Sequence, residues 1–179
     1  MGAEPGPPAP RTIAAVCAEI ADRDGFTLRP WDVEWAHTLV SAWNDPAIAL
    51  WNPVPPEPTL AVAQSWIWGT ASQNEASVGI DVVMVDMASG EVAGEIGLQV
   101  DPSQGVGEFG FWIASDFRGR GAAKALCAFA TDLAASLELK GLVALVDPAN
   151  AAAIGLLESV AWPELPTKSE RRAFAYRTP

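Results

Sequence analysis

The chain has 179 residues, of which half are apolar and 18% are charged, and its formal net charge is −11. This composition excludes an intrinsically disordered protein and is enough for one domain with a substantial core. No apolar run approaches the length of a membrane span, and residues 1–10 lack the cationic and apolar stretch of a secretory signal. Two cysteines and one histidine argue against a disulfide framework or a metal site, so we expect a cytoplasmic location.

The charges are distributed unevenly along the chain. Residues 30–117 contain twelve acidic side chains and no lysine or arginine. Three of the eleven cationic residues fall within seven positions, Arg118, Arg120 and Lys124. The negative field repels nucleic acid and anionic membranes and favours cationic partners, so we expect neither nucleic acid nor membrane as a partner. The small basic cluster therefore requires its own explanation.

The amino-terminal part of the chain is predicted to be mostly helical, because apolar side chains recur there at helical spacing. In chain order we expect a disordered Pro-rich tail (1–10), a helical extension (11–24), a strand (26–29), a helix capped by Asp32, an irregular loop with five prolines (46–58), and a helix from Thr59 to about Asn74.

The rest of the chain is predicted to alternate between strands and helices. We expect three antiparallel strands (78–87, 91–100 and 106–113), a helix (119–139), a buried strand (142–146), a helix begun by Asp147-Pro148 and ending near Ser159, and a last strand near the sheet edge (171–177). Residues 25–179 then form one α/β domain. Its mixed, mostly antiparallel sheet contains one β-α-β crossover and has helices on both faces.

The basic cluster lies where a strand is predicted to end and a helix to begin. Arg118, Gly119, Arg120 and Gly121 are followed by Ala122 and Ala123, so the side chains near the helix start are small. The first N–H groups of a helix have no internal partner, and the helix dipole adds positive potential there. This arrangement is typical of a pyrophosphate site, whereas the plainer interpretation is a glycine turn with surface arginines.

The motifs around this turn resemble those of the GNAT superfamily of acyl-CoA-dependent N-acyltransferases. Arg118-Gly-Arg-Gly121-Ala-Ala123 fits the family's loop pattern Arg/Gln-x-x-Gly-x-Gly/Ala. Glu108-Phe-Gly110-Phe-Trp112-Ile113 and Phe26-Thr-Leu-Arg29-Pro30 look like strands of the subgroup that includes ribosomal-protein N-terminal (alanine) acetyltransferases. Asn150 matches the asparagine that reaches the pantetheine arm. The resemblance covers residues 26–177.

The resemblance implies a GNAT fold that uses acetyl-CoA as cosubstrate and no metal. The residues that it assigns to the cofactor are Arg118, Gly119, Arg120, Gly121, Ala122 and Ala123 at the pyrophosphate, Asn150 at the pantetheine, and the backbone near Trp112 and Ile113 at the pantetheine and the thioester carbonyl. Donors placed there stabilise charge that develops in the transition state.

Glu108 is the candidate general base, acting through a water molecule, and it also faces the acceptor. The family's proton-donating tyrosine is absent, since its position holds Leu157 and the chain's only tyrosine is Tyr176. A thiol with a pKa near 8.5 leaves without an acid, and an α-amine with a pKa of roughly 7.7–8.0 is easier to deprotonate than lysine. We therefore prefer a protein or peptide N-terminus, or a small cationic amine, as acceptor.

Six of the eight tryptophans fall within residues 31–68. We expect Trp35, Trp43 and Trp66 to pack in the core, and Trp51, in the proline-rich loop, to line the acceptor pocket. Three functions remain open: an active acetyltransferase, a CoA-binding module with weakened catalysis, and an acidic protein-interaction domain. A homodimer is compatible with each of them.

Overall fold

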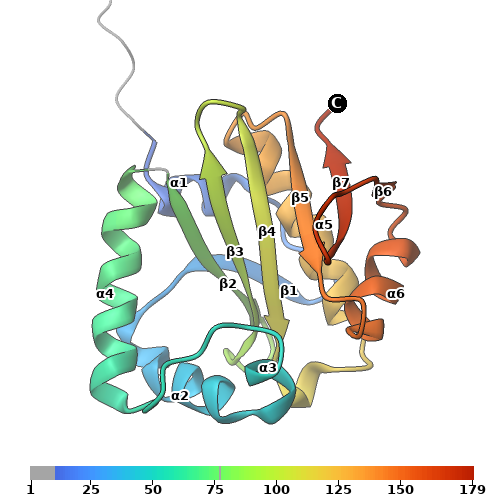
Figure 1. Ribbon diagram of the computed structural model, residues 1–179. Coiled ribbons are helices and arrows are strands. Elements are labelled where there is room, and N and C mark those ends of the chain that lie inside the picture. The colour runs from blue at the N-terminus through green and yellow to red at the C-terminus, as the bar shows by residue number, and fades with distance from the viewer. Residues whose placement is uncertain (1–10, 77) are drawn as a thin grey trace, which may run out of the picture.

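The computed structural model describes residues 11–76 and 78–179, and the predicted tail, 1–10, lies outside this range. Figure 1 shows a central sheet with helices on both faces. The seven strands follow the order β1-β2-β3-β4-β5-β7-β6. The strands are β1 (Phe26–Pro30), β2 (Gly79–Asp86), β3 (Val92–Asp101), β4 (Val106–Ile113), β5 (Gly141–Val146), β6 (Glu164–Leu165) and β7 (Arg172–Arg177). The β4–β5 pair is parallel and the other neighbouring pairs are antiparallel, which confirms the predicted fold class.

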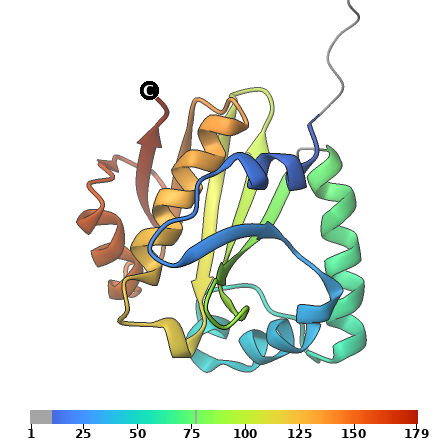
Figure 2. The same cartoon turned by 180° about the vertical axis from the view of Figure 1, so that it is seen from behind.

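The helices divide into two groups, one on each face of the sheet. One group is α1 (Ile13–Glu19), α5 (Ala122–Ser136) and α6 (Ala151–Ser159); the other is α2 (Ala36–Asn44), α3 (Pro46–Ala49) and α4 (Leu60–Ala76). The view from behind shows α5 crossing the sheet diagonally, with α1 beside it (Figure 2). No helix of the described residues is long and apolar enough to cross a bilayer.

Each face of the sheet has its own hydrophobic cluster. Alternate side chains of a strand point to opposite faces, so Phe109 and Ile113 of β4 join α1, α5 and α6, whereas Trp112 joins α2 and α4. On the Trp112 side, Trp43 is buried and Trp35 and Trp66 are partly buried in the cluster, as predicted. We call this side of the sheet the tryptophan face.

The amino-terminal helix is part of the core. Val16 and Cys17 of α1 are buried in the same cluster as the α5 side chains. Arg11 also donates to the Ser136 carbonyl at the end of α5, at 3.1 Å. The segment predicted as a helical extension therefore packs against the sheet and α5.

Several elements differ from the prediction. The helix expected at 119–139 is α5, Ala122–Ser136, because Gly119 and Gly121 adopt left-handed φ angles. The proline-rich loop begins with the short helix α3, and the last strand, β7, lies between β5 and the added edge strand β6. The helix α6 starts at Ala151 and not at Pro148, because Asn150 is the residue that caps it. Asp147 instead forms a turn, in which its side chain accepts from the Ala149 N–H at 2.8 Å.

Candidate active site

The centre of the candidate site is the place where two parallel strands separate. β4 and β5 pair only over the three positions Val106–Gly141, Gly107–Leu142 and Glu108–Val143. Beyond them β4 continues along β3, while β5 continues along β7. A wedge therefore opens between the carboxyl-terminal halves of the two strands, at the lower end of the sheet in Figure 1.

The backbone of β4 offers hydrogen-bonding groups to this wedge. The Lys140 N–H donates to the Gly105 carbonyl at 2.8 Å, so the odd-numbered residues of β4 face β5. In the open part these residues are Phe109, Phe111 and Ile113, whose groups have no β5 partner in the register. Of the two predicted pantetheine residues, Ile113 faces the wedge, whereas the backbone of Trp112 faces β3.

The start of α5 presents consecutive unpaired N–H groups. Gly119 and Gly121 have φ angles of 72° and 84°, the left-handed region that glycine adopts without strain. Within the described chain, the N–H groups of residues 119–123 have no protein acceptor. A Cβ atom at either glycine would meet nothing within 4 Å, so the space above them is open. A curved run of free amides at a helix start is an anion site.

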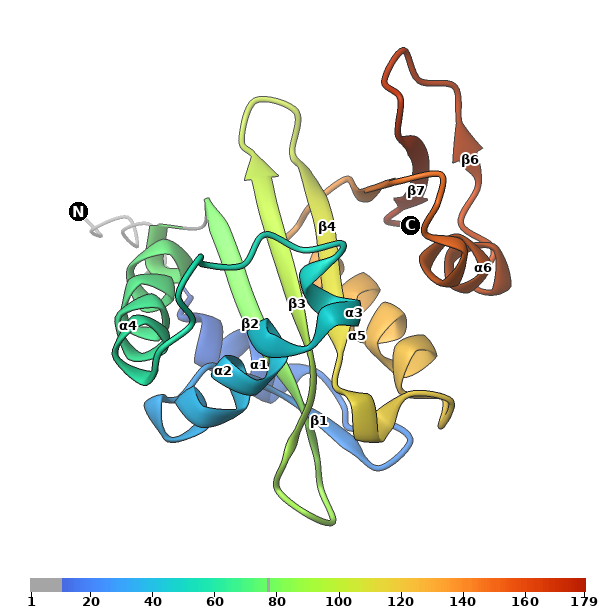
Figure 3. The same cartoon turned by 60° about the horizontal axis from the view of Figure 1, so that its bottom comes forward.

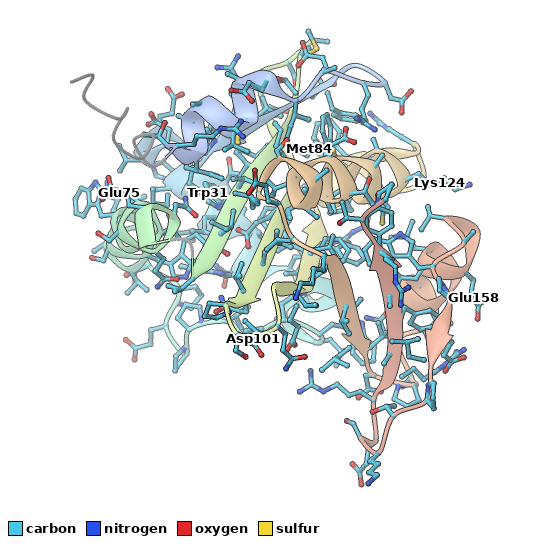
Figure 4. All side chains as sticks on the ribbon, turned by 90° about the horizontal axis from the view of Figure 1, so that it is seen from above. Trp31, Glu75, Met84, Asp101, Lys124 and Glu158 are labelled. Carbon is cyan, nitrogen blue, oxygen red and sulfur yellow. The ribbon has the colours of Figure 1, made fainter. Side chains whose placement is uncertain are left out.

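The three cations of the loop have different roles. Arg118 donates to the Ile113 carbonyl at 3.0 Å and pairs with Asp45, the residue that caps α3, at 2.7 Å. Although burial opposes the effect, the Ala47 N–H and this guanidinium lower the pKa of the Asp45 carboxyl. Arg118 therefore ties the loop to α3. Arg120 and Lys124 are exposed, and Lys124 extends outward at the amino-terminal end of α5 (Figure 4).

The predicted acceptor residue Glu108 lies on the tryptophan face. Glu108 is exposed and lines a pocket of about 300 Å³ with Gln99, Gln104 and Val143. Trp51 lies outside this lining, 37% exposed, just after α3. Figure 3 shows the loop from α3 to α4 crossing in front of this face. The structure thus places Glu108 in a pocket and Trp51 on the loop that borders the face.

A family model described as "Acetyltransferase (GNAT) domain" matches residues 26–161. The chain belongs to the GNAT acetyltransferase family. It is therefore an acyltransferase, with acetyl-CoA as the cosubstrate, and among the described residues no group of side chains is arranged to hold a metal ion. No curated protein matches the sequence.

Solved GNAT structures share the fold over most of the chain. The ribosomal-protein-S5-alanine acetyltransferase from Vibrio fischeri is 14% identical, with a TM-score of 0.74, and the match covers 88% of this chain and 96% of that one. The spermidine N-acetyltransferase from Vibrio cholerae, solved with CoA and spermine, is 17% identical, with a TM-score of 0.73, and the match covers 87% of this chain and 97% of that one. The microcin C7 self immunity acetyltransferase MccE, solved with acetyl-CoA and AMP, is 15% identical, with a TM-score of 0.74, and the match covers 91% of this chain and 94% of that one.

The GNAT positions on α6 are occupied differently from the family pattern. The Asn150 side-chain oxygen accepts from the Ala153 N–H at 3.1 Å, which leaves its amide N–H₂ as the group available to a ligand. Leu157, at the position of the family's tyrosine, is completely buried in the core. Tyr176 stacks on Trp162 and pairs with Leu142, at the closed end of the wedge.

Two acidic residues within the sheet, the buried Asp81 and the half-buried Glu95, were missed by the sequence analysis. Asp81 on β2 and Glu95 on β3 lie on the tryptophan face, next to Gly97 and Trp112 in the strand register. Burial raises the pKa of Asp81 to about 6. Burial and the charge of Asp81 raise the pKa of Glu95 to about 8, although the indoles of Trp31 and Trp112 donate to it. An acidic residue within an apolar strand was the available signal.

Proposed function

We propose that this GNAT protein transfers the acetyl group of acetyl-CoA to a primary amine, either a protein or peptide N-terminus or a small cationic amine. One observation carries the proposal. Five consecutive N–H groups, those of residues 119–123, have no acceptor in the described part of the chain and lie at the start of α5, next to the open wedge. Such a pair of features suits a diphosphate attached to an extended chain.

The residues present fit CoA along its length. The amides of 119–123 suit the diphosphate, with Arg120 and Lys124 as additional positive charges. The backbone groups of Phe111, the Ile113 N–H and the Asn150 amide suit the amide groups of the pantetheine arm, because the Ile113 carbonyl already accepts from Arg118. Because Arg118 is paired with Asp45, we assign it to holding the loop in place and not to direct phosphate binding.

The chemistry requires a base more than an acid. The acceptor ammonium loses a proton to Glu108 through a water molecule, and the free amine then attacks the thioester carbonyl. A C–N bond forms, the attacking nitrogen releases its second proton to solvent, the C–S bond breaks, and the sulfur leaves as the thiolate of CoA. A thiol with a pKa near 8.5 departs without protonation, so the buried Leu157 does not prevent the reaction.

The acceptor class follows from charge and from the structural neighbours. The acidic region 30–117 supplies most of the tryptophan face, which favours a cationic acceptor. The neighbours are named for a ribosomal-protein alanine and for spermidine, both of which present primary amines. These names support an amine acceptor without deciding between the two kinds.

The proposal is tested by CoA binding and turnover in Gly121→Asp. The substitution forces a side chain into a left-handed position and adds a carboxylate where the diphosphate binds, so we expect CoA affinity to fall on the order of 100-fold. Isothermal titration calorimetry measures the affinity, and thiol release with a panel of amines measures turnover. Gly105→Asp, the same change at a left-handed glycine at the other end of β4, is the matched control.

The possible outcomes separate the three functions. Unchanged CoA affinity in Gly121→Asp contradicts the loop assignment. If the parent protein does not bind CoA, the protein-interaction domain is the one function of the three that remains. Tight CoA binding without acetylation of any amine indicates a CoA-binding module. If Glu108→Gln binds CoA normally and retains turnover, Glu108 is not the base.

A further inference from the structure

A buried carboxylate on the tryptophan face has no hydrogen-bond partner among the residues that the structure describes. Asp81 is only 9% exposed, and among the described residues its side chain accepts no hydrogen bond. Its backbone is held rigidly: where β1 has ended, the Asn74 side chain accepts from the Asp81 N–H at 2.9 Å and donates to the Asp81 carbonyl at 3.3 Å. The backbone of Asp81 is therefore fixed in position, and its carboxylate is unpaired among the described residues.

The Asp81 carboxylate points over a floor made by two glycines. Gly97 on β3 lies opposite Asp81 on one side and Gly110 on the other. A Cβ atom at Gly97 would lie 3.2 Å from the Asp81 Oδ1, whereas one at Gly110 would meet nothing within 4 Å. The space above Gly110 is open and leads to Glu108, one position further along the same face of β4.

The electrostatics of this floor favour a cation. Burial keeps Glu95 neutral, as its raised pKa shows, so the negative charge rests on Asp81. On this face the neighbouring strands add two acidic side chains, Glu95 from β3 and Glu108 from β4, and one cation, the exposed Arg29 of β1, which lies opposite Val83, two residues along β2 from Asp81. Burying a carboxylate without a partner costs stability, and a cationic ligand group would remove that cost.

We infer that Asp81 binds a second cationic group of the acceptor, so that the preferred substrates are linear molecules with two amino groups. The inference rests on the proposed function, because it places the reacting amine beside Glu108. Two strand spacings and two residues along the strand separate the Cα atoms of Asp81 and Glu108 by roughly 12 Å. An extended diamine spans the distance between the two carboxylates.

The test compares two acceptors of equal length, α,ω-diaminopentane and the corresponding aminopentanol. We expect the parent protein to prefer the diamine. In Asp81→Asn the KM for the diamine should rise about tenfold or more, because one charge-assisted contact is lost, while kcat and the KM for the aminopentanol stay unchanged. Glu91→Gln, which removes an exposed charge before β3, is the matched control and should behave like the parent protein.

A folding measurement and a binding measurement complete the design. Because Asp81 is buried and unpaired, the melting temperature of Asp81→Asn should equal or exceed that of the parent protein. Calorimetric titration of α,ω-diaminopentane into the CoA complex measures the cation site without turnover. Equal losses for both acceptors, or no loss for either, overturn the inference and leave the proposed function standing. Failure to acetylate any amine overturns the proposed function, whereas diamine binding that depends on Asp81 still supports the cation site.

Discussion

At the scale of single residues, the site is shaped by carboxyl groups in different surroundings. Glu108 is exposed in a pocket, whereas Asp81 is buried and Glu95 is half-buried on the tryptophan face. Trp31 donates to Glu95 at 3.0 Å, yet the desolvation and the neighbouring Asp81 outweigh this hydrogen bond and keep Glu95 protonated. The fold therefore stores a proton beside the cation site that we infer.

The stored proton makes folding stability depend on pH. The unfolded chain releases the Glu95 proton near pH 4.5, whereas the folded protein holds it until about pH 8. The folded state then binds more protons between these values, so the free energy of unfolding falls as the pH rises through this window. In Glu95→Gln the fall should be smaller. The variant should gain about 2–4 kcal/mol on the parent protein between pH 5 and pH 9, allowing for partial exposure of the carboxyl.

Urea unfolding followed by tryptophan fluorescence at several pH values measures this difference. Asp81→Asn is the control for the neighbouring carboxyl, whose own contribution ends near pH 6. Parallel stability curves for Glu95→Gln and the parent protein would contradict a raised pKa at Glu95.

At the scale of elements, the sequence predicted what depends on local patterns. The Val106–Ile113 strand and the glycine loop after it follow from alternation and from turn chemistry. The dipeptide Asp-Pro shows the limit of such reasoning. Asp45-Pro46 starts α3, whereas Asp147-Pro148 forms a turn before Asn150 caps α6. The aspartate of such a dipeptide can either cap a helix or close a turn by a local hydrogen bond, and the packing of the surrounding elements decides which of the two forms.

The register in which the strands pair could not be predicted from the sequence. Asp81, Gly97 and Gly110 are far apart along the chain and become neighbours only through the strand register. The same register shows that Phe109 and Phe111, and not Trp112, expose their backbone in the wedge. A one-residue shift would reverse both conclusions, and nothing local in the sequence fixes that shift.

The end of α6 offers a test of backbone strain. The Trp162 N–H donates to the Leu157 carbonyl and the Ala161 N–H to the Glu158 carbonyl, each at 3.0 Å, in the pattern of a Schellman motif. This motif favours glycine at the position of Ala161, which has a φ angle of 59°. Ala161→Gly should therefore raise the free energy of unfolding by about 1 kcal/mol, or the melting temperature by roughly 2–4 °C.

Thermal unfolding of the purified protein measures this effect. Ala149→Gly, in the turn before α6, is the control, because a glycine where no left-handed residue is needed should not stabilise the protein. A lower melting temperature for Ala161→Gly would show that the alanine side chain contributes packing that outweighs the strain.

At the scale of the whole molecule, the sites proposed for the two substrates lie on opposite faces of the sheet and differ in charge. The N–H groups of residues 119–123 lie at the start of α5, which covers one face of the sheet. The acidic region 30–117 builds most of the opposite face. In the function that we propose, the diphosphate is held by local amides and two nearby cations, whereas the amine is attracted by the field of many carboxylates. Local contacts and a long-range field respond differently to salt.

Ionic strength should therefore act mainly on the amine. With acetyl-CoA saturating, raising the salt from about 0.02 M to about 0.3 M shortens the screening length to below 10 Å, so kcat/KM for α,ω-diaminopentane should fall several-fold. The aminopentanol carries one charge and should lose less. Initial rates of thiol release give both values, with a neutral osmolyte of equal osmolarity as the control. Equal losses for the two acceptors would mean that the net charge of −11 does not guide the amine, and that local contacts alone select it.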